Sequence, residues 1–416
     1  MASGELEVDP DVAFGMQVLP GNEYPRKHTL FLNFNGGMLY SGADNSAENR
    51  STLAKQGVYP AYEGGAQKAM AIIQAVQEDV APYGIIVAFE ERPPSVVPYT
   101  MEMVGGFWQD TNISAPAAGV APGSDCGALG QRHVVYTFAG GGVSATQAAN
   151  TVSQEAGHAW GLDHTFNCDS VMSYCGLGDG GFASTCDALC EEMCQGINSA
   201  GCRLTHELFC GEDNDQQNED AELTYLFGGN EPDIEPPVVE ILEPEDGLEV
   251  EEGADVDVRS LVSDDYGGYG WYYVITHNGM EAANFVDFDR QVDADYRPAI
   301  NLTQLPPGVW EITVGTQDHF GHTAQDTVTV YVEAAAGSSG EDTGADTDGS
   351  AIDDTHDDEG CACRSGAPQG AGWALWGLWG LVGLRRRRPR IVRDLAPRGR
   401  EERGAGTRTL RKSAEA

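Results

Sequence analysis

Apolar residues in the first 160 positions recur with the periods of strands and helices. The run T-L-F-L-N at Thr29–Asn33 is typical of a buried strand, and Ile72 and Val76 share one face of a predicted helix. The pattern predicts, in order, a helix over Gly65–Ala81, strands at Ile85–Phe89 and Tyr99–Val104, an edge strand within residues 105–131, a strand at His133–Phe138 and a helix from Ser144 to about Trp160. Ser144 and Gln147 have the spacing of a capping box. We therefore expect an α/β sandwich with a mixed sheet as the first part of an α+β chain.

Residues 232–333 change to short alternating strands separated by turns. The predicted strands are Val238–Leu242, Val256–Ser260, Trp271–Thr276, one within Leu305–Val314, and Thr327–Val332. This spacing indicates an all-β sandwich and resembles bacterial immunoglobulin-like domains, a likeness that implies a fold and no function. His319 and His322 fall in a hairpin of this part, and we expect them to be ordinary surface residues.

Pattern and composition divide the chain into six segments. These are an irregular lead-in (1–26), a mixed α and β domain with a cysteine-rich end (27–230), the sandwich (231–333), an acidic linker (334–360), a tail with a short apolar run and an arginine cluster (361–388), and a basic end (389–416). A chain of 416 residues exceeds one ordinary core, so at least two folded domains are expected. The linker consists mainly of Gly, Ser, Thr and Asp, a composition that favours disorder.

The chain is strongly acidic, with a formal net charge of −41. Half of its 24 Lys and Arg lie in residues 385–416, so the body carries few cations. The acidic body therefore argues against nucleic-acid binding through a basic surface, since such binding needs clustered Lys and Arg. The acidic segment Glu212–Ala221 offers carboxylates to calcium, but its spacing does not match an EF-hand, and we expect a solvated loop.

Cysteines are concentrated in one stretch of the chain. Eight of the ten fall between Cys126 and Cys210, a density typical of a disulfide-stapled region in an oxidising compartment. A metal cluster is the alternative, because Cys186, Cys190 and Cys194 are spaced by four and would share a helical face. The absence of a C-x-x-C pair there favours disulfides, and the pairing stays open.

The tail has the features of a surface anchor. Cys361 and Cys363 precede an apolar run at Ala371–Leu384 and four arginines at Arg385–Arg388. Fourteen apolar residues span about 21 Å as a helix, short of a hydrocarbon core of about 30 Å. The arrangement resembles the myxobacterial C-terminal sorting signal, which implies cleavage near the cysteines and attachment to the cell envelope. A weak transmembrane anchor is the alternative. Residues 1–10 lack a signal peptide, so we expect the true start to lie upstream.

The segment Q-E-A-G-H-A-W-G-L-D-H carries the candidate chemistry. Gln154 and His158 lie one helical turn apart on the same face, so both side chains can hold one cation. Glu155 stands beside them, within reach of a metal-bound water. Gly161 allows the chain to turn back and bring His164 to the same cation. Three protein ligands and an open position define a catalytic zinc site.

This segment resembles the metzincin family of zinc peptidases, whose motif is H-E-x-x-H-x-x-G-x-x-H followed by a methionine turn. Four positions match, namely Glu155, His158, Gly161 and His164, whereas Gln154 replaces the first histidine. The run S-V-M-S-Y that follows is similar to the methionine turn, which implies an apolar floor formed by Met172. Tyr174 occupies the position of a tyrosine that ligates zinc or steadies the transition state in the astacin and serralysin branches. The resemblance covers about residues 28–175.

Two functions follow from these features. In the first, the protein is a cell-surface zinc peptidase in which Glu155 is the base, Tyr174 hydrogen-bonds the oxyanion, and the edge strand pairs with a protein or peptide substrate. In the second, an impaired metzincin-like domain acts as a binding or adhesion module. The retained Glu155 favours the first function and Gln154 favours the second. The oligomeric state stays open.

Overall fold

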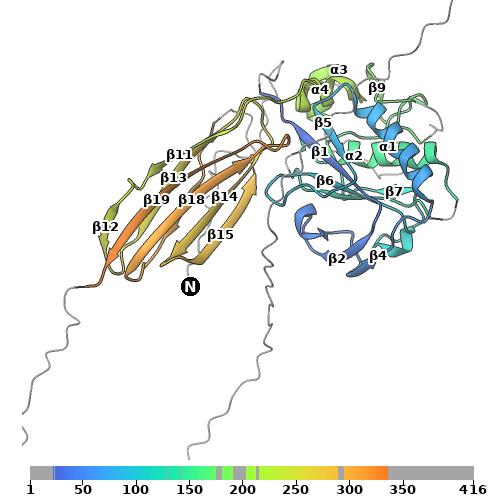
Figure 1. Ribbon diagram of the computed structural model, residues 1–416. Coiled ribbons are helices and arrows are strands. Elements are labelled where there is room, and N and C mark those ends of the chain that lie inside the picture. The colour runs from blue at the N-terminus through green and yellow to red at the C-terminus, as the bar shows by residue number, and fades with distance from the viewer. Residues whose placement is uncertain are drawn as a thin grey trace, which may run out of the picture. The chain divides into compact units, whose positions relative to one another are not determined.

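The computed structural model describes residues 22, 24–128, 130–140, 142–174, 180–190, 203–211, 215–288 and 295–335 (Figure 1). The predicted linker beyond residue 335, the apolar run, the arginine cluster and the basic end, with Cys361 and Cys363, lie outside these residues. So does most of the predicted lead-in. Among the described residues, no helix has the length and apolar character needed to cross a membrane.

A five-stranded mixed sheet forms the framework of the first part. Its order is β5 (Ile85–Ala88), β1 (His28–Asn33), β6 (Thr100–Val104), β8 (Val134–Thr137) and β7 (Gly119–Val120). The first four strands are parallel, and β7 is antiparallel to β8. The sequence pattern predicted each of these strands to within two residues and confined the edge strand to residues 105–131. The mixed sheet is therefore as expected.

Each face of this sheet is covered by different elements. Helices α1 (Ala66–Val80) and α2 (Ala145–Ala159) share a core with Leu30 and Leu32 of β1. On the opposite face, Phe31 of β1 packs in a second core with Leu39 and Tyr59. Those two residues belong to a small sheet, β2 (Gly37–Ser41), β3 (Arg50–Ser51) and β4 (Gly57–Tyr59), which the sequence pattern did not predict. Two short 3-10 helices, Ser46–Glu48 and Trp108–Asp110, complete this part.

The end of this part contains two short strands and two helices. They are β9 (Asp187–Ala188), α3 (Arg203–Cys210), β10 (Gln216–Gln217) and α4 (Glu219–Phe227). The prediction of a solvated loop at Glu212–Ala221 is wrong for its second half, because Glu219 starts α4 and is fully buried. Its carboxylate accepts hydrogen bonds from Ser170 and from the backbone of Ala183, and these replace the solvent that a charge run usually faces.

The second part is a β-sandwich of two sheets. One contains β11 (Val238–Glu243), β13 (Val256–Ser263), β16 (Asp295–Tyr296) and β17 (Ala299–Leu302). The other has the order β12 (Leu248–Glu251), β19 (Thr323–Glu333), β18 (Gly308–Gln317), β14 (Gly270–His277) and β15 (Met280–Phe288). Alternate residues of facing strands, including Val258, Trp271 and Ile312, fill a core of their own. The chain is therefore α+β with an all-β sandwich, as the strand spacing indicated.

Candidate metal centre

Helix α2 presents the first half of the Q-E-A-G-H segment toward the interior. Ser144 caps the helix, since its hydroxyl accepts the Gln147 amide at 3.1 Å while Gln147 bonds back to Ser144. The helix carries Gln154, Glu155 and His158 in its last two turns. Glu155 and His158 are buried, and Gln154 is half-buried. These polar side chains lie on a helix that packs against the core, which is a costly position unless each has a partner.

His158 and His164 meet as two facing imidazoles. Their Nε2 atoms are 3.2 Å apart, and the rings are nearly perpendicular. The His158 Nδ1–H donates to the Leu162 carbonyl at 2.6 Å, which leaves the lone pair on Nε2. Two ligand nitrogens on a tetrahedral zinc are about 3.4 Å apart, given Zn–N distances of about 2.1 Å. The spacing of this pair and the tautomer of His158 fit a shared metal ion.

Both imidazoles are held in the neutral form that binds metals. Burial lowers the pKa of His158, and it lowers that of His164 to about 3 with a further contribution from His158. A neutral imidazole is the form that ligates zinc. The aromatic ring of Tyr174 stacks on His164 with 4.0 Å between ring centroids, and the tyrosine is 48% exposed. Tyr174 is thus beside the second histidine and open to solvent.

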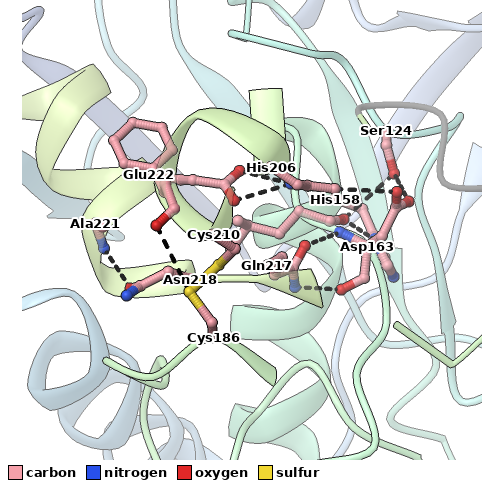
Figure 2. A network of polar contacts seen from close by, with 12 residues as sticks. Ser124, His158, Asp163, Cys186, His206, Cys210, Gln217, Asn218, Ala221 and Glu222 are labelled. Carbon is pink, nitrogen blue, oxygen red and sulfur yellow. Dashed lines mark hydrogen bonds and ion pairs between the residues drawn. A yellow bond between two sulfur atoms is a disulfide. The ribbon is translucent and has the colours of Figure 1, made fainter. Parts of the chain in front are cut away.

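The turn between the two histidines is fixed by a buried polar network. Gly161 has a φ of 110°, a conformation that favours glycine, and it ends the helix. Two residues later, Asp163 is clamped by Gln217, whose amide bonds both the backbone N–H (2.8 Å) and the carbonyl (2.6 Å) of Asp163. Ser124 donates to the Asp163 carboxylate at 2.9 Å, and His206 lies 3.3 Å from it (Figure 2). This network therefore holds the neighbouring residue, His164, in place.

His206 is the charged centre of that network. It is fully buried, and its Nδ1 lies 2.9 Å from the Glu222 carboxylate (Figure 2). Hydrogen bonds to Asp163 and Glu222 outweigh burial and raise the pKa of His206 to about 9, so it is a cation at neutral pH. The sequence reading missed Asp163, His206, Gln217 and Glu222. No local motif joins residues so far apart in the chain, and the only signal was a polar residue between Gly161 and His164.

The predicted methionine turn packs against helix α2. Met172 is fully buried, and its carbonyl accepts the Thr165 amide at 3.1 Å. A Cβ added at Gly157 would lie 2.7 Å from the Met172 sulfur, so the turn packs on the helix where glycine leaves room. The Ser170 hydroxyl accepts the Met172 amide at 2.9 Å and donates to Glu219. Glu219 of helix α4 therefore helps to fix the conformation of the turn through Ser170.

Gln154 and Glu155 have separate partners. The Gln154 amide Nε2 donates to the Val171 carbonyl at 2.9 Å, which ties the helix to the methionine turn. Burial raises the pKa of Glu155 to about 8, although a hydrogen bond from the Ala121 backbone opposes that shift. A Cβ added at Gly119 would come within 2.7 Å of the Glu155 carboxylate, so strand β7 passes close to this acid. The structure thus places an edge strand beside Glu155.

Disulfides are present in the cysteine-rich region. Cys186 and Cys210 are bridged, and this bond joins the β9 region to the end of α3. Cys126 and Cys168 each take part in a disulfide as well. Among the described cysteines, Cys190 is a buried free thiol. The prediction that these cysteines form disulfides is confirmed for Cys186 and Cys210, whereas Cys190 is not bridged.

Comparisons with known proteins bear on the fold alone. No family model and no curated protein matches the chain. Fibronectin(III)-like modules of Clostridium thermocellum CbhA are 19% identical over 24% of this chain and 49% of theirs, with a TM-score of 0.18. The RIG-5 IG1 homodimer is 13% identical over 24% of this chain and 99% of its own (TM-score 0.18). The BIgI domain of beta protein from S. agalactiae bound to CEACAM1 is 16% identical over 23% of this chain and 98% of its own (TM-score 0.17).

This chain therefore spans about half the length of the first of these structures. All three are immunoglobulin-like or fibronectin-like domains. Similarities with such TM-scores add no argument of their own, and the immunoglobulin-like sandwich rests on its own two sheets and single core.

Proposed function

We propose that residues 27–230 form a metzincin-like zinc metallopeptidase domain that hydrolyses peptide bonds. The observation that carries this proposal is the facing pair of buried, neutral imidazoles, with 3.2 Å between the Nε2 atoms of His158 and His164. The lone pair of neutral His158 lies on Nε2, since Nδ1–H donates to Leu162, and the spacing of the two Nε2 atoms suits a shared zinc ion. His158, His164 and the Gln154 side-chain oxygen would hold the zinc.

Bound zinc would supply an activated water and polarise the substrate carbonyl. Glu155 is the proposed base, because it neighbours Gln154 on helix α2 and its carboxylate lies beside the edge strand β7. Tyr174 is the proposed oxyanion donor, since it stacks on His164 and is exposed to an incoming substrate.

Strand β7 is the proposed binding edge for an extended peptide. It ends the sheet order, with β8 as its partner among the described strands, so one edge is left for strand addition. Its Gly119 lies against Glu155, and a peptide on this edge would pass near the proposed base.

A second function, a binding or adhesion module with little catalysis, is favoured by one contact. Gln154 donates its amide to the Val171 carbonyl, so this side chain already has a structural partner. A neutral amide oxygen is also a poorer zinc ligand than imidazole. Structural zinc sites with four ligands bind with about 10–16 kcal/mol, so exchanging one poor ligand for a good one is worth roughly 3 kcal/mol, about a hundredfold in affinity.

The Gln154→His variant distinguishes the two functions. We expect zinc affinity to rise about a hundredfold and peptidase activity to appear or increase, while Glu155→Ala in the same background abolishes cleavage. The matched control is Gln74→His, which makes the same change at an exposed position of α1. A Gln154→His protein that binds zinc no better than the Gln74→His protein and cleaves no peptide would favour the binding module.

We further propose that the domain works outside the cytoplasm, attached to the cell envelope through residues 361–388. The disulfide between Cys186 and Cys210 supports export, because such bonds persist in oxidising compartments. Mass spectrometry of the surface-bound protein tests the anchor. Cleavage near Cys361 is expected, and peptides from residues 389–416 in that form would contradict processing.

A further inference from the structure

Carboxylates from three separate segments meet at one end of the β-sandwich. Asp233 lies in the connector before β11, Asp264 and Asp265 follow β13, and Asp318 follows β18. One oxygen each of Asp233, Asp264 and Asp265 lies within 4.8 Å of the other two. Asp233, Asp318 and His322 form a second group with the same spacing. Because Asp233 belongs to both groups, the five residues form one set, here called the Asp233 cluster.

Two oxygens of the Asp233 cluster are buried without a hydrogen-bond partner. They are Oδ1 of Asp233 and Oδ2 of Asp264, and their residues are 3% and 7% exposed. A carboxylate that is buried without a partner costs several kcal/mol, so such oxygens in a folded protein call for a proton or a cation. Burial and the neighbouring carboxylates raise the pKa of both groups, which expresses the same deficit of positive charge.

Three other oxygens of the cluster are held in place by donors of the chain. The Asp318 Oδ1 accepts the backbone amides of Phe320 and His322, each at 2.8 Å. The other oxygen of Asp318 accepts the His322 Nδ1–H at 2.7 Å. Asp264 Oδ1 accepts the Asp265 amide at 2.9 Å. These bonds orient the carboxylates before any ligand binds, as in a prepared cation site.

Lys27 interacts electrostatically with Asp233 and Asp265 but forms no ion pair with them. Its Nζ donates to the Gly229 carbonyl at 3.0 Å and lies 4.0 Å from the centre of the Tyr266 ring. Burial lowers the pKa of Lys27 even though Asp233 and Asp265 act to raise it. No ion pair joins Lys27 to these carboxylates in the part of the chain that the structure describes. Lys27 therefore provides no counter-charge to the cluster.

We propose that the Asp233 cluster binds one calcium ion. Its ligands would be oxygens of Asp233, Asp264, Asp265 and Asp318, with water completing the shell. Calcium takes six to eight oxygen ligands in irregular geometry, and a set of carboxylates from separate loops provides this more readily than the octahedron that magnesium demands. His322 bonds the Asp318 carboxylate, so we assign it the role of a positioning residue. This site is independent of the proposed zinc centre.

The ion would fasten the connector to the sandwich. Asp233 lies in the connector before the sandwich. Asp264 and Asp318 directly follow strands β13 and β18, which belong to different sheets. A cation shared by all three would join both sheets and the connector at one point. Calcium would therefore stabilise the fold, because it binds the folded chain and not the separated loops of the unfolded one.

Calorimetric titration of the full chain with calcium tests the proposal. The protein is first dialysed against a chelator, and the buffer contains about 150 mM NaCl to screen weak surface binding. We expect saturable binding at this site and a melting temperature that rises with calcium concentration. Asp264→Asn and Asp233→Asn should each weaken binding at least about tenfold.

The matched control is Asp257→Asn, the same change at an exposed position of the same sandwich, which should leave the calcium response unchanged. His158→Ala should leave it unchanged too, and so separates this site from the zinc proposal. Three results would overturn the inference: no binding and no thermal shift in the parent, parent-like binding by both cluster variants, or equal affinity for magnesium. Exposed Asp265→Ala provides a third variant if a buried one fails to fold.

Discussion

Replacing His206 by glutamine tests whether the buried network beneath the proposed metal centre stabilises this part of the protein. His206 is fully buried between two acids, with 3.3 Å to Asp163 and 2.9 Å to Glu222. Glutamine has a similar length and can keep one hydrogen bond, but it carries no charge. The variant therefore leaves the carboxylates of Asp163 and Glu222 without the cation between them.

The magnitude follows from the pKa of the imidazole. A folded-state pKa of about 9, against about 6.5 in the unfolded chain, corresponds to about 3 kcal/mol of stabilisation. Because this pKa is raised on folding, the contribution is complete below about pH 6.5 and is lost as the pH rises through about 9. The pKa of Asp163 is lowered, whereas burial raises that of Glu222 despite His206. The network of the three residues therefore stabilises the fold by less than the pKa of the histidine alone implies.

Urea unfolding measures the contribution of the His206 charge to stability. The parent and the His206→Gln variant are compared at pH 6 and at pH 9.5 with a chelator present. We expect the variant to be less stable by about 2–3 kcal/mol at pH 6 and the difference to shrink by pH 9.5. His277→Gln, at a half-buried histidine of the sandwich outside the network, is the control. A difference that is the same at both pH values would refute the assignment of a buried cation at His206.

Further outcomes follow from other contacts. Glu155→Gln should make the metal-free protein more stable than the parent at pH 9 but not at pH 4, and thermal melts at both pH values measure this. The pKa of Glu155 is raised from 4.5 to about 8 on folding, so the parent loses stability as the pH rises between these two values. Gly119→Val should destabilise the fold by about 1–3 kcal/mol in urea unfolding, since even a Cβ there lies 2.7 Å from Glu155. Replacing Cys186 and Cys210 by serine should cost about 3 kcal/mol in the same assay, because the bridge closes a loop with a sequence separation of 24.

The framework of the first part was predictable because its signals are local. Buried strands such as β1 and β6 are continuous apolar runs, and α2 has both a capping box and a small-residue face. The Q-E-A-G-H segment placed Gln154, His158 and His164 near one another through helix periodicity and the turn at Gly161. The structure brings the two histidines together, and it places the Gln154 amide on the Val171 carbonyl.

The missed features depend on long-range pairing. Strands β3 and β4 contain two and three residues, too few to show a period, and they fold because Tyr59 and Leu39 cover the second face of the sheet. Glu219 sits in an acidic run that is typical of a solvated loop. Only the fold reveals that Ser170 and Ala183 provide hydrogen bonds for its carboxylate. His319 and His322 were expected on the surface, but His319 bonds Thr29 and Gly268, and His322 bonds Asp318.

Zinc content of the purified full chain is the measurement that tests the central claim most directly. The protein is stripped with a chelator, titrated with zinc and analysed for bound metal. The account predicts one zinc that is lost in both His158→Ala and His164→Ala. It is retained in His133→Ala, the control at a histidine that bonds Asp125 instead. Zinc binding that persists in the His158→Ala protein, or no zinc in the parent at saturating concentration, would contradict the assignment of a metal centre to this pair.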